Sequence, residues 1–313
     1  MYFEGSEKKL TLTINHHNIS LLNDFDDNFW QQLVERCQAK ILSKITNQQC
    51  TAYLLSESSL FIWDDHFVLI TCGRTNLVSA INFFIKAVKP SDINQLIFQR
   101  KNEYFSYAQP SNFFEDIKQL QQNFNGCAAR FGALDSHHNY LYHLTKTSNQ
   151  NLVNSSYEFL AYQISPETSE FLCQPNLTVD QIREFLQLST ILQGFQVDDF
   201  LFSPFGYSLN AINGEKYLTI HITPQQNSSY VSVESNLNLL SITPHFLSLL
   251  QPASFDLIAF NQAEFSELNN HYIPKNYLIK EQVESTLCSN ELVNFANYIQ
   301  PMATKIAPYT IDI

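Results

Sequence analysis

Ser58 lies in a Glu-Ser-Ser tripeptide, residues 57–59, inside an otherwise apolar stretch. Apolar residues fill positions 52–55 and 60–63, so hydroxyls and a carboxylate stand where a buried strand would favour apolar side chains. Such a local departure from the expected pattern often marks a functional site. Cys72, fourteen residues after Ser58, adds a thiol. An activated serine hydroxyl is a nucleophile, and a thiol can act as a nucleophile or as an acid, but each residue alone would be an ordinary strand or core residue.

The surroundings of Ser58 and Cys72 belong to a series of motifs that resembles the eukaryotic-type S-adenosylmethionine decarboxylases. The motifs follow the family's order, at close to the family's spacing, from residue 2 to residue 232. They are 2–8 (YFEGSEK), 55–60 (LSESSL), 71–73 (TCG), 100–102 (RKN), 204–208 (PFGYS), 219–224 (TIHITP) and 229–232 (SYVS). Beyond residue 240 little of the resemblance remains.

The resemblance implies a serine that is consumed to make a cofactor. The hydroxyl of Ser58 would attack the carbonyl of Glu57, the ester would undergo β-elimination, and the resulting dehydroalanine would lose ammonia to leave a pyruvoyl group. The chain would be split into residues 1–57 (β chain) and 58–313 (α chain). A decarboxylase needs such a carbonyl, which forms a Schiff base with the substrate, because no ordinary side chain can hold the electron pair left by carbon dioxide. Neither a metal nor pyridoxal phosphate (PLP) is expected.

Self-processing needs a donor for an oxyanion and a base for the α-proton of residue 58. By resemblance, Ser208 and His221 serve these steps. The turn signal Asn213-Gly214 between them allows their segments to fold back on each other. Cys72 would be the acid that reprotonates the substrate's α-carbon, because a thiol with an unperturbed pKa of about 8.5 is largely protonated at neutral pH.

The resemblance also implies residues that contact the substrate. Glu4 and Glu7 would join the catalytic site if the segment bends, which Gly5 makes feasible. The sulfonium and adenine of S-adenosylmethionine require aromatic faces. The family's stacking pair falls at Phe3 and Phe202, and Glu57 would also contact the substrate.

Two sites depart from the family pattern. Gln225 replaces the ribose-binding acid, and since a charge-assisted hydrogen bond is roughly twice as strong as a neutral one, we expect weaker substrate binding. In some family members buried acids receive putrescine. Glu158 and Glu234 match that cluster, but its two other acids and a lysine are replaced by Asn154, Thr11 and Ile70. The lost charge balance argues against putrescine activation.

Charge and composition exclude several classes of protein. The net charge is −12 with only 18 Lys and Arg, and no basic run occurs, so nucleic acid is not an expected partner. No apolar run approaches the roughly 18 residues of a membrane span, and the first residues do not read as an export signal. We therefore expect a cytoplasmic protein without membrane contact.

The cysteines and histidines show no ligand spacing. Six cysteines are scattered without a Cys-x-x-Cys pair: Cys37, Cys50, Cys72, Cys127, Cys173 and Cys288. This pattern disfavours disulfides and structural zinc. The histidine pairs 16–17 and 137–138 likewise lack the spacing of a metal site, so we predict no metal.

Hydrophobic periodicity predicts antiparallel sheets with helices on their outer faces, and the resemblance sharpens this to an α+β, four-layer αββα sandwich with internal duplication. A helix is predicted over 29–45 behind acidic caps at 26–27, with Trp30, Leu33, Val34, Cys37, Ile41 and Leu42 on one face. The other predicted elements are a strand at 10–14, a hairpin of 52–63 and 67–72, a helix at 75–88, a hairpin of 217–223 and 230–235, and a helix at 244–250. We predict one domain of two pseudo-repeat halves, 1–150 and 151–313, joined through the polar segment 145–156.

These observations favour a self-processing decarboxylase that makes the aminopropyl donor for spermidine and spermine synthesis. Two alternatives remain open. One is an inactive paralogue that regulates an active decarboxylase, although such proteins typically lack the processing serine or its helpers. The other is a hydrolase with Cys72 as nucleophile and His221 as base, which needs a lowered cysteine pKa. A monomer and an (αβ)₂ homodimer are both compatible with the sequence.

Overall fold

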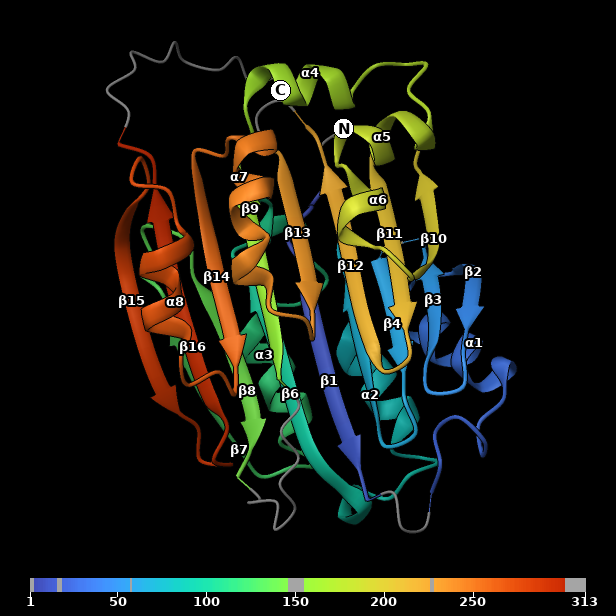
Figure 1. Ribbon diagram of the computed structural model, residues 1–313. Helices are drawn as coiled ribbons and strands as arrows, with labels where there is room; N and C mark the ends of the chain where they lie inside the picture. Colours follow the sequence, from blue (N-terminus) through green and yellow to red (C-terminus); the bar gives the residue numbers. More distant parts are fainter. Residues whose placement is uncertain (1–2, 16–18, 57, 146–154, 226–227, 302–313) are drawn as a thin grey trace.

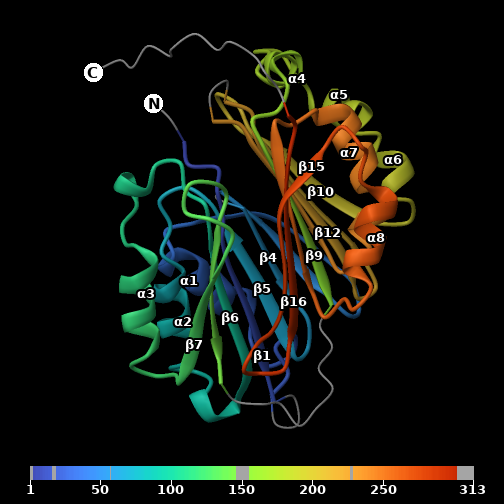
Figure 2. The same ribbon diagram turned by 90° about the vertical axis from the view of Figure 1, so that its left-hand side faces the viewer.

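The computed structural model describes residues 3–15, 19–56, 58–145, 155–225 and 228–301. Two eight-stranded sheets pack face to face, and helices cover the outer face of each sheet (Figure 1 and Figure 2). Every strand pairing described is antiparallel. The predicted four-layer αββα sandwich is therefore confirmed.

The first half builds one sheet and its helices. Its strands are β1 (Lys8–Ile14), β2 (Ile41–Thr46), β3 (Thr51–Leu55), β4 (Ser58–Ile62), β5 (His66–Thr71), β6 (Ile93–Lys101), β7 (Gly126–Phe131) and β8 (Asn139–Leu144). Its helices are α1 (Asp27–Arg36), α2 (Leu77–Phe84) and α3 (Phe113–Leu120), with 3-10 turns at Pro90–Asp92 and Ser106–Ala108.

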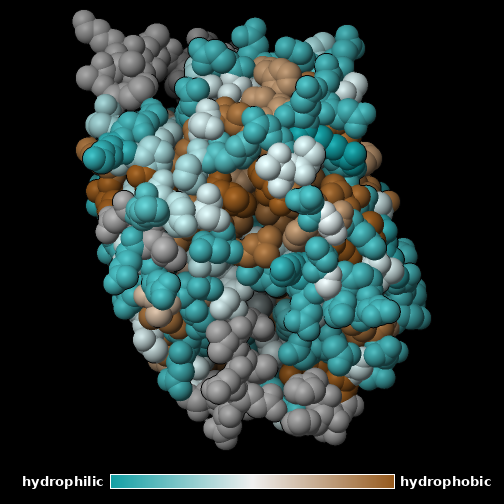
Figure 3. Space-filling model, viewed as in Figure 1, coloured by the Kyte–Doolittle hydropathy of each residue, from teal (hydrophilic) through white to brown (hydrophobic). Residues whose placement is uncertain are grey.

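The second half builds the other sheet. Its strands are β9 (Ser156–Tyr162), β10 (Gln196–Leu201), β11 (Tyr207–Asn213), β12 (Lys216–Thr223), β13 (Tyr230–Ser235), β14 (Ser254–Phe260), β15 (Leu278–Thr286) and β16 (Leu292–Ile299). Its helices are α4 (Pro166–Leu172), α5 (Val179–Phe185), α6 (Leu188–Ile191), α7 (Thr243–Leu250) and α8 (Phe265–Tyr272), with a 3-10 turn at Leu239–Ser241. Hydrophilic side chains cover most of the face that carries these helices, and apolar ones show between them (Figure 3).

Both halves repeat one strand order. The first sheet runs β2-β3-β4-β5-β1-β6-β8-β7, and the second runs β10-β11-β12-β13-β9-β14-β16-β15. In each sheet the first strand of the half therefore occupies a central position. The expected internal repeat is present in the topology, while the predicted junction falls mainly on residues 146–154, outside the described residues.

Side chains alternate between the outer and inner faces of the sheets. In β1, Leu10 and Leu12 pack with the helices of the first half, whereas Lys9 points to the second sheet and contacts Glu158 on β9. Two apolar clusters fill the space between the sheets near their opposite edges. Polar and charged side chains lie between these clusters, so the centre of the molecule holds a buried polar layer.

Two predicted elements were wrong in extent. The helix predicted over 29–45 ends at Arg36, because Gln38 adopts a left-handed φ of 68° and stops it; Ile41 and Leu42 belong to strand β2, which pairs with β3. The predicted strand 52–63 is itself a hairpin of β3 and β4, since Leu55 pairs with Ser58 across a tight turn. The Asp26 cap and the helices and hairpins near residues 77, 217 and 243 are confirmed.

Within the described ranges, no helix combines the length and the apolar character that crossing a membrane requires.

Candidate functional site

A cavity of about 1450 Å³ opens where strands of both sheets meet α4. Seven residues predicted from the sequence line it: Phe3, Ser58, Cys72, Phe202, Ser208, His221 and Gln225. They come from five separate segments of both halves. Glu57, predicted as the cleavage residue and as a substrate contact, lies outside the described residues.

Ser58 adopts a strained backbone conformation at the start of β4. Its φ is 139°, a left-handed value that costs a residue with a side chain on the order of 1–3 kcal/mol. Its side chain is buried, and its Oγ has no hydrogen-bond partner among the described residues. A buried hydroxyl without a partner adds a desolvation cost of about 1–3 kcal/mol. The first cost falls on the backbone and the second on the hydroxyl of a residue that lines the cavity, and such a local departure is typical of a functional residue.

Ser208 and His221 face each other across β11 and β12, where they form a register pair. Ser208 Oγ lies 2.9 Å from Nδ1 of His221. Burial lowers the pKa of His221 to about 3, so the imidazole is neutral at physiological pH. A neutral imidazole is the form that can accept a proton, and the predicted turn at Asn213-Gly214 brings the two side chains together.

Three further polar residues hold the other side of the His221 ring. Thr219 Oγ1 lies 2.8 Å and Ser59 Oγ 3.3 Å from Nε2. Both hydroxyls also donate to Oδ1 of Asn210, at 3.2 Å and 2.5 Å. These residues were not singled out from the sequence. The sequence signal that could have revealed Asn210 and Thr219 is a separation of two residues, from Ser208 to Asn210 and from Thr219 to His221. This separation places the two polar side chains of each pair on one face of a strand.

Cys72 directly follows β5 and is partly buried. Ser58 pairs with Thr71 in the β4–β5 register, so Cys72 is the next residue along the chain from the partner of Ser58. The sequence placed the two residues on adjacent strands, and the structure agrees except that Cys72 lies just beyond the strand end. Both residues line the cavity.

Glu4 and Glu7 contact different elements. Glu4 accepts hydrogen bonds from the backbone N–H of Phe105, at 2.6 Å, and of Ser6. Glu7 accepts one from the hydroxyl of Ser232 at 2.6 Å, and burial raises the pKa of its carboxyl to about 8. Neither carboxyl belongs to the described residues that line the cavity, so their catalytic roles stay predictions.

Gly5 lets the N-terminal segment approach the second sheet. A Cβ at this position would lie 3.0 Å from side-chain atoms of both Thr223 and Tyr230. Contacts this close are rarely tolerated, so glycine is required here for packing rather than for an unusual φ. The segment that carries Phe3 and Glu4 is thereby held against β12 and β13.

Gln225 binds the backbone of Phe3 in two directions. The Phe3 N–H donates to Oε1 at 2.8 Å, and Nε2 donates to the Phe3 carbonyl at 2.6 Å. A carboxylate at this position could accept the first hydrogen bond but could not donate the second. The amide at this position therefore fixes the partly exposed Phe3 at the wall of the cavity, which Phe202 on the β10–β11 loop also lines.

A buried charge cluster lies between the sheets, away from this cavity. Lys9 Nζ lies 2.9 Å from Glu158 and 2.7 Å from Glu234, and Lys101 also pairs with Glu158. Burial alone would raise the pKa of Glu158, but the charges of Lys101 and Lys9 lower it. Lys9 and Thr11 line a second cavity of about 740 Å³. The two acids predicted to match a putrescine cluster, Glu158 and Glu234, thus form ion pairs with lysines of the same chain. Asn154 lies outside the described residues.

Comparisons with known proteins agree with the motifs. Residues 1–299 match the family described as adenosylmethionine decarboxylase. An S-adenosylmethionine decarboxylase proenzyme of Trypanosoma brucei brucei is 31% identical over 277 residues, which cover 82% of this chain and 75% of that protein. The proenzymes of Xenopus laevis (31% identical, 76% of each chain) and Drosophila melanogaster (28% identical, 83% of this chain and 82% of that protein) are also similar.

One solved structure shares the fold. It is described as the Trypanosoma brucei AdoMetDC-delta26 monomer and superposes with a TM-score of 0.59 at 24% identity. The match covers 78% of this chain and 99% of that chain.

Proposed function

Because the chain belongs to the adenosylmethionine decarboxylase family, we propose that it is a self-processing, pyruvoyl-dependent enzyme that releases carbon dioxide from S-adenosylmethionine. The product would be the aminopropyl donor for spermidine and spermine synthesis. The observation that carries the proposal is the state of Ser58. Its hydroxyl is buried and has no hydrogen-bond partner among the described residues, its backbone is strained at φ 139°, and the residue lines a cavity together with Cys72 and His221.

The residues around Ser58 fit the formation of a pyruvoyl group. The hydroxyl attacks the carbonyl carbon of residue 57, an ester bond replaces the peptide bond, and the nitrogen of residue 58 becomes a free amine. Removal of the α-proton then expels the carboxylate of residue 57, and water releases ammonia. His221, neutral because it is buried, is the base for that proton, and Ser208 next to it is a donor for the oxyanion.

A pyruvoyl group at residue 58 supplies the carbonyl that accepts the electron pair left by carbon dioxide. The side chains of the cavity do the rest. Phe3 and Phe202 bind the adenine and the sulfonium, and the amide of Gln225 keeps Phe3 in place. Cys72 delivers a proton to the substrate's α-carbon from the strand end next to Ser58.

We also propose that this enzyme works without putrescine. An activating diamine would bring ammonium groups to Glu158 and Glu234, and Lys9 already contacts both carboxylates. The charges are therefore balanced inside the chain. An added dication would have to displace a buried ion pair, which costs several kcal/mol when a partner charge is left uncompensated.

The alternative is an inactive paralogue that regulates a second decarboxylase. Intact mass spectrometry of the freshly purified wild-type chain and of Ser58→Ala separates the two functions. Fragments of 1–57 and 58–313 in the wild type alone, with a pyruvoyl group opening the larger one, would support the enzyme. An uncut chain in both samples would instead favour the regulatory protein.

A further inference from the structure

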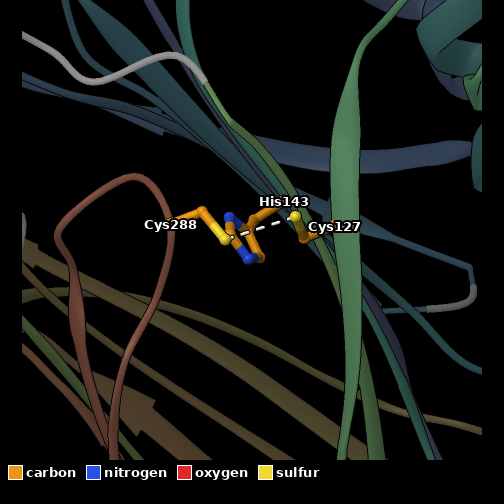
Figure 4. Close-up of side chains that lie close together, drawn as sticks. All are labelled: Cys127, His143 and Cys288. Atoms are coloured by element: carbon orange, nitrogen blue, oxygen red, sulfur yellow. Dashed lines mark hydrogen bonds between the residues drawn. The ribbon is translucent and has the colours of Figure 1, made fainter.

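Two cysteines and a histidine from distant segments meet between the sheets. Cys127 lies on β7, His143 on β8, and Cys288 in the loop that joins β15 to β16 (Figure 4). One donor atom of each lies within 4.8 Å of the others, and the two Sγ atoms are 3.2 Å apart. The first two residues belong to the first sheet and the third to the second, so the cluster bridges the two halves.

The fold of the first sheet places two of these side chains together. Cys127 pairs with His143 in the antiparallel register of β7 and β8, so both project from the same face. That face looks into the space between the sheets, because Phe131 and Leu141, which share it, pack against Phe295 of the second sheet. The edge of the first sheet therefore presents a thiol and an imidazole to its partner sheet.

A tight turn in the second half supplies the other thiol. Leu287 and Glu291 close the turn through a backbone hydrogen bond of 2.8 Å, and Asn290 adopts a left-handed φ of 75°. Cys288 lies within this turn and is exposed to solvent. A short closed turn has few conformations available, so its thiol is held in place rather than carried on a long loop.

The imidazole of His143 is oriented as a ligand. Its Nδ1 lies 2.9 Å from the carbonyl oxygen of Leu144 and 3.1 Å from Ser289 Oγ. A carbonyl oxygen can only accept, so the proton is on Nδ1 and Nε2 keeps its lone pair. Histidines that bind metals usually donate their other N–H to a backbone carbonyl or a carboxylate in this way. Ser289 in turn bonds Glu291, which extends the support.

We propose that Cys127, His143 and Cys288 bind a zinc ion that ties the edges of the two sheets together. Two sulfurs and one imidazole nitrogen are ligands that zinc favours, and water can fill the fourth position because Cys288 is exposed. Each thiol gives its proton to solvent as its bond to zinc forms. The sequence predicted no metal, since spacing along the chain could not reveal a cluster assembled from three separate segments.

The sulfur separation fits zinc better than a disulfide. Tetrahedral bonds of about 2.3 Å from one zinc ion place two sulfurs ~3.8 Å apart. A disulfide requires about 2.05 Å, so the observed 3.2 Å is closer to the zinc geometry. A disulfide would also leave the alignment of His143 unexplained. None of the three residues lines the cavity that holds Ser58. In Figure 1 the loop between β15 and β16 lies at the lower end of the sandwich, whereas α4 lies at the upper end.

The experiment measures zinc on the full chain in reducing buffer. Metal content by mass spectrometry and titration with zinc chloride should give equimolar binding for the wild type. Cys127→Ser, Cys288→Ser and His143→Gln should lose it, and Cys173→Ser, which changes a thiol elsewhere, should not. Ser289→Ala, which removes one partner of Nδ1, should weaken binding roughly ten-fold. Zinc should also raise the Tm of the wild type but not of Cys288→Ser.

Wild-type protein that takes up no zinc would overturn the proposal. So would equimolar binding that survives both Cys288→Ser and His143→Gln. Because Cys288 is exposed, its variant should fold even if a buried variant does not, and circular dichroism would verify this. Peptide mapping that finds a Cys127–Cys288 disulfide persisting in zinc-supplemented protein would replace the metal site by a covalent link.

Discussion

Ser208 Oγ lies 2.9 Å from Nδ1 of His221, and Ser59, the neighbour of Ser58, contacts the other nitrogen of the same ring at 3.3 Å. The imidazole thus connects β11 with the first residues of β4. Through it, the second half of the chain reaches the bond that would be cut in the first half. Self-processing would therefore depend on the two sheets being correctly packed.

The first prediction concerns this histidine. His221→Gln keeps a polar side chain but removes the base, so we expect cleavage between residues 57 and 58 to slow by roughly 10²–10⁴-fold. Gel electrophoresis of samples taken after synthesis would follow the uncut chain over time. His271→Gln, at an exposed position on α8, is the control and should cut normally. Normal cutting of the His221 variant would remove the residue from self-processing.

The second prediction concerns stability at low pH. The pKa of His221 is about 3 in the fold, while an unfolded histidine titrates near 6.5. Between these values the unfolded chain binds a proton that the folded chain does not, so stability falls as pH falls below 6.5. From pH 7.5 to 5.5 this group should cost about 1 kcal/mol.

Urea denaturation of Ser58→Ala with and without His221→Gln would measure that cost, since both proteins remain single chains. The loss on acidification should be about 1 kcal/mol smaller when His221 is replaced. Equal losses in the two proteins would show that His221 is not held neutral by the fold.

The third prediction separates processing from turnover. Cys72→Ala should still give the two fragments, because in the proposed mechanism its thiol serves only the later proton transfer. Decarboxylation, measured as released carbon dioxide, should fall by about 10²-fold or more in kcat with little change in KM. An uncut Cys72→Ala chain would place the thiol in self-processing, and wild-type turnover would exclude it from both steps.

The fourth prediction concerns Lys9. Lys9→Ala leaves Glu158 and Glu234 short of a counter-charge in a buried layer, so we expect a loss of about 3–5 kcal/mol in stability. Putrescine should stabilise this variant and leave the wild type unchanged, measured as Tm with and without the diamine. Lys44→Ala breaks an exposed ion pair with Asp27 and should cost less than about 1 kcal/mol. Putrescine that stabilises the wild type equally would contradict internal charge balance.

The family resemblance predicted the sandwich and most of the cavity residues, because the residues that carry the resemblance lie in short local motifs. Ser58, Cys72, Ser208 and His221 stand in short segments with distinctive neighbours, and the predicted hairpins placed the members of each pair on adjacent segments. The helix predicted over 29–45 was too long, because the apolar spacing of its last residues also suits an edge strand. The helix ends before the left-handed backbone of Gln38, and a glutamine does not predict such a backbone in the way that a glycine does.

Other features depend on contacts between distant segments. The pairing of Gln225 with Phe3 joins residues more than two hundred positions apart, and no local pattern encodes it. The same holds for Cys127, His143 and Cys288. Their spacing along the chain matches no metal-binding motif, and only the packing of the two halves brings them together. Lys9 is a further case: no local pattern predicts its burial, but the second sheet covers it.

The position of β1 has a consequence for the processed protein. This strand lies between β5 and β6, so residues 1–57 would contribute the middle of the first sheet and one of its edges. The two fragments would be interleaved and could not exchange between molecules without opening the sheet on both sides of β1. After denaturation, the precursor could refold as a unimolecular reaction, whereas the cut protein would depend on fragment concentration. Cleavage would thus make refolding of the denatured protein depend on the association of two separate fragments.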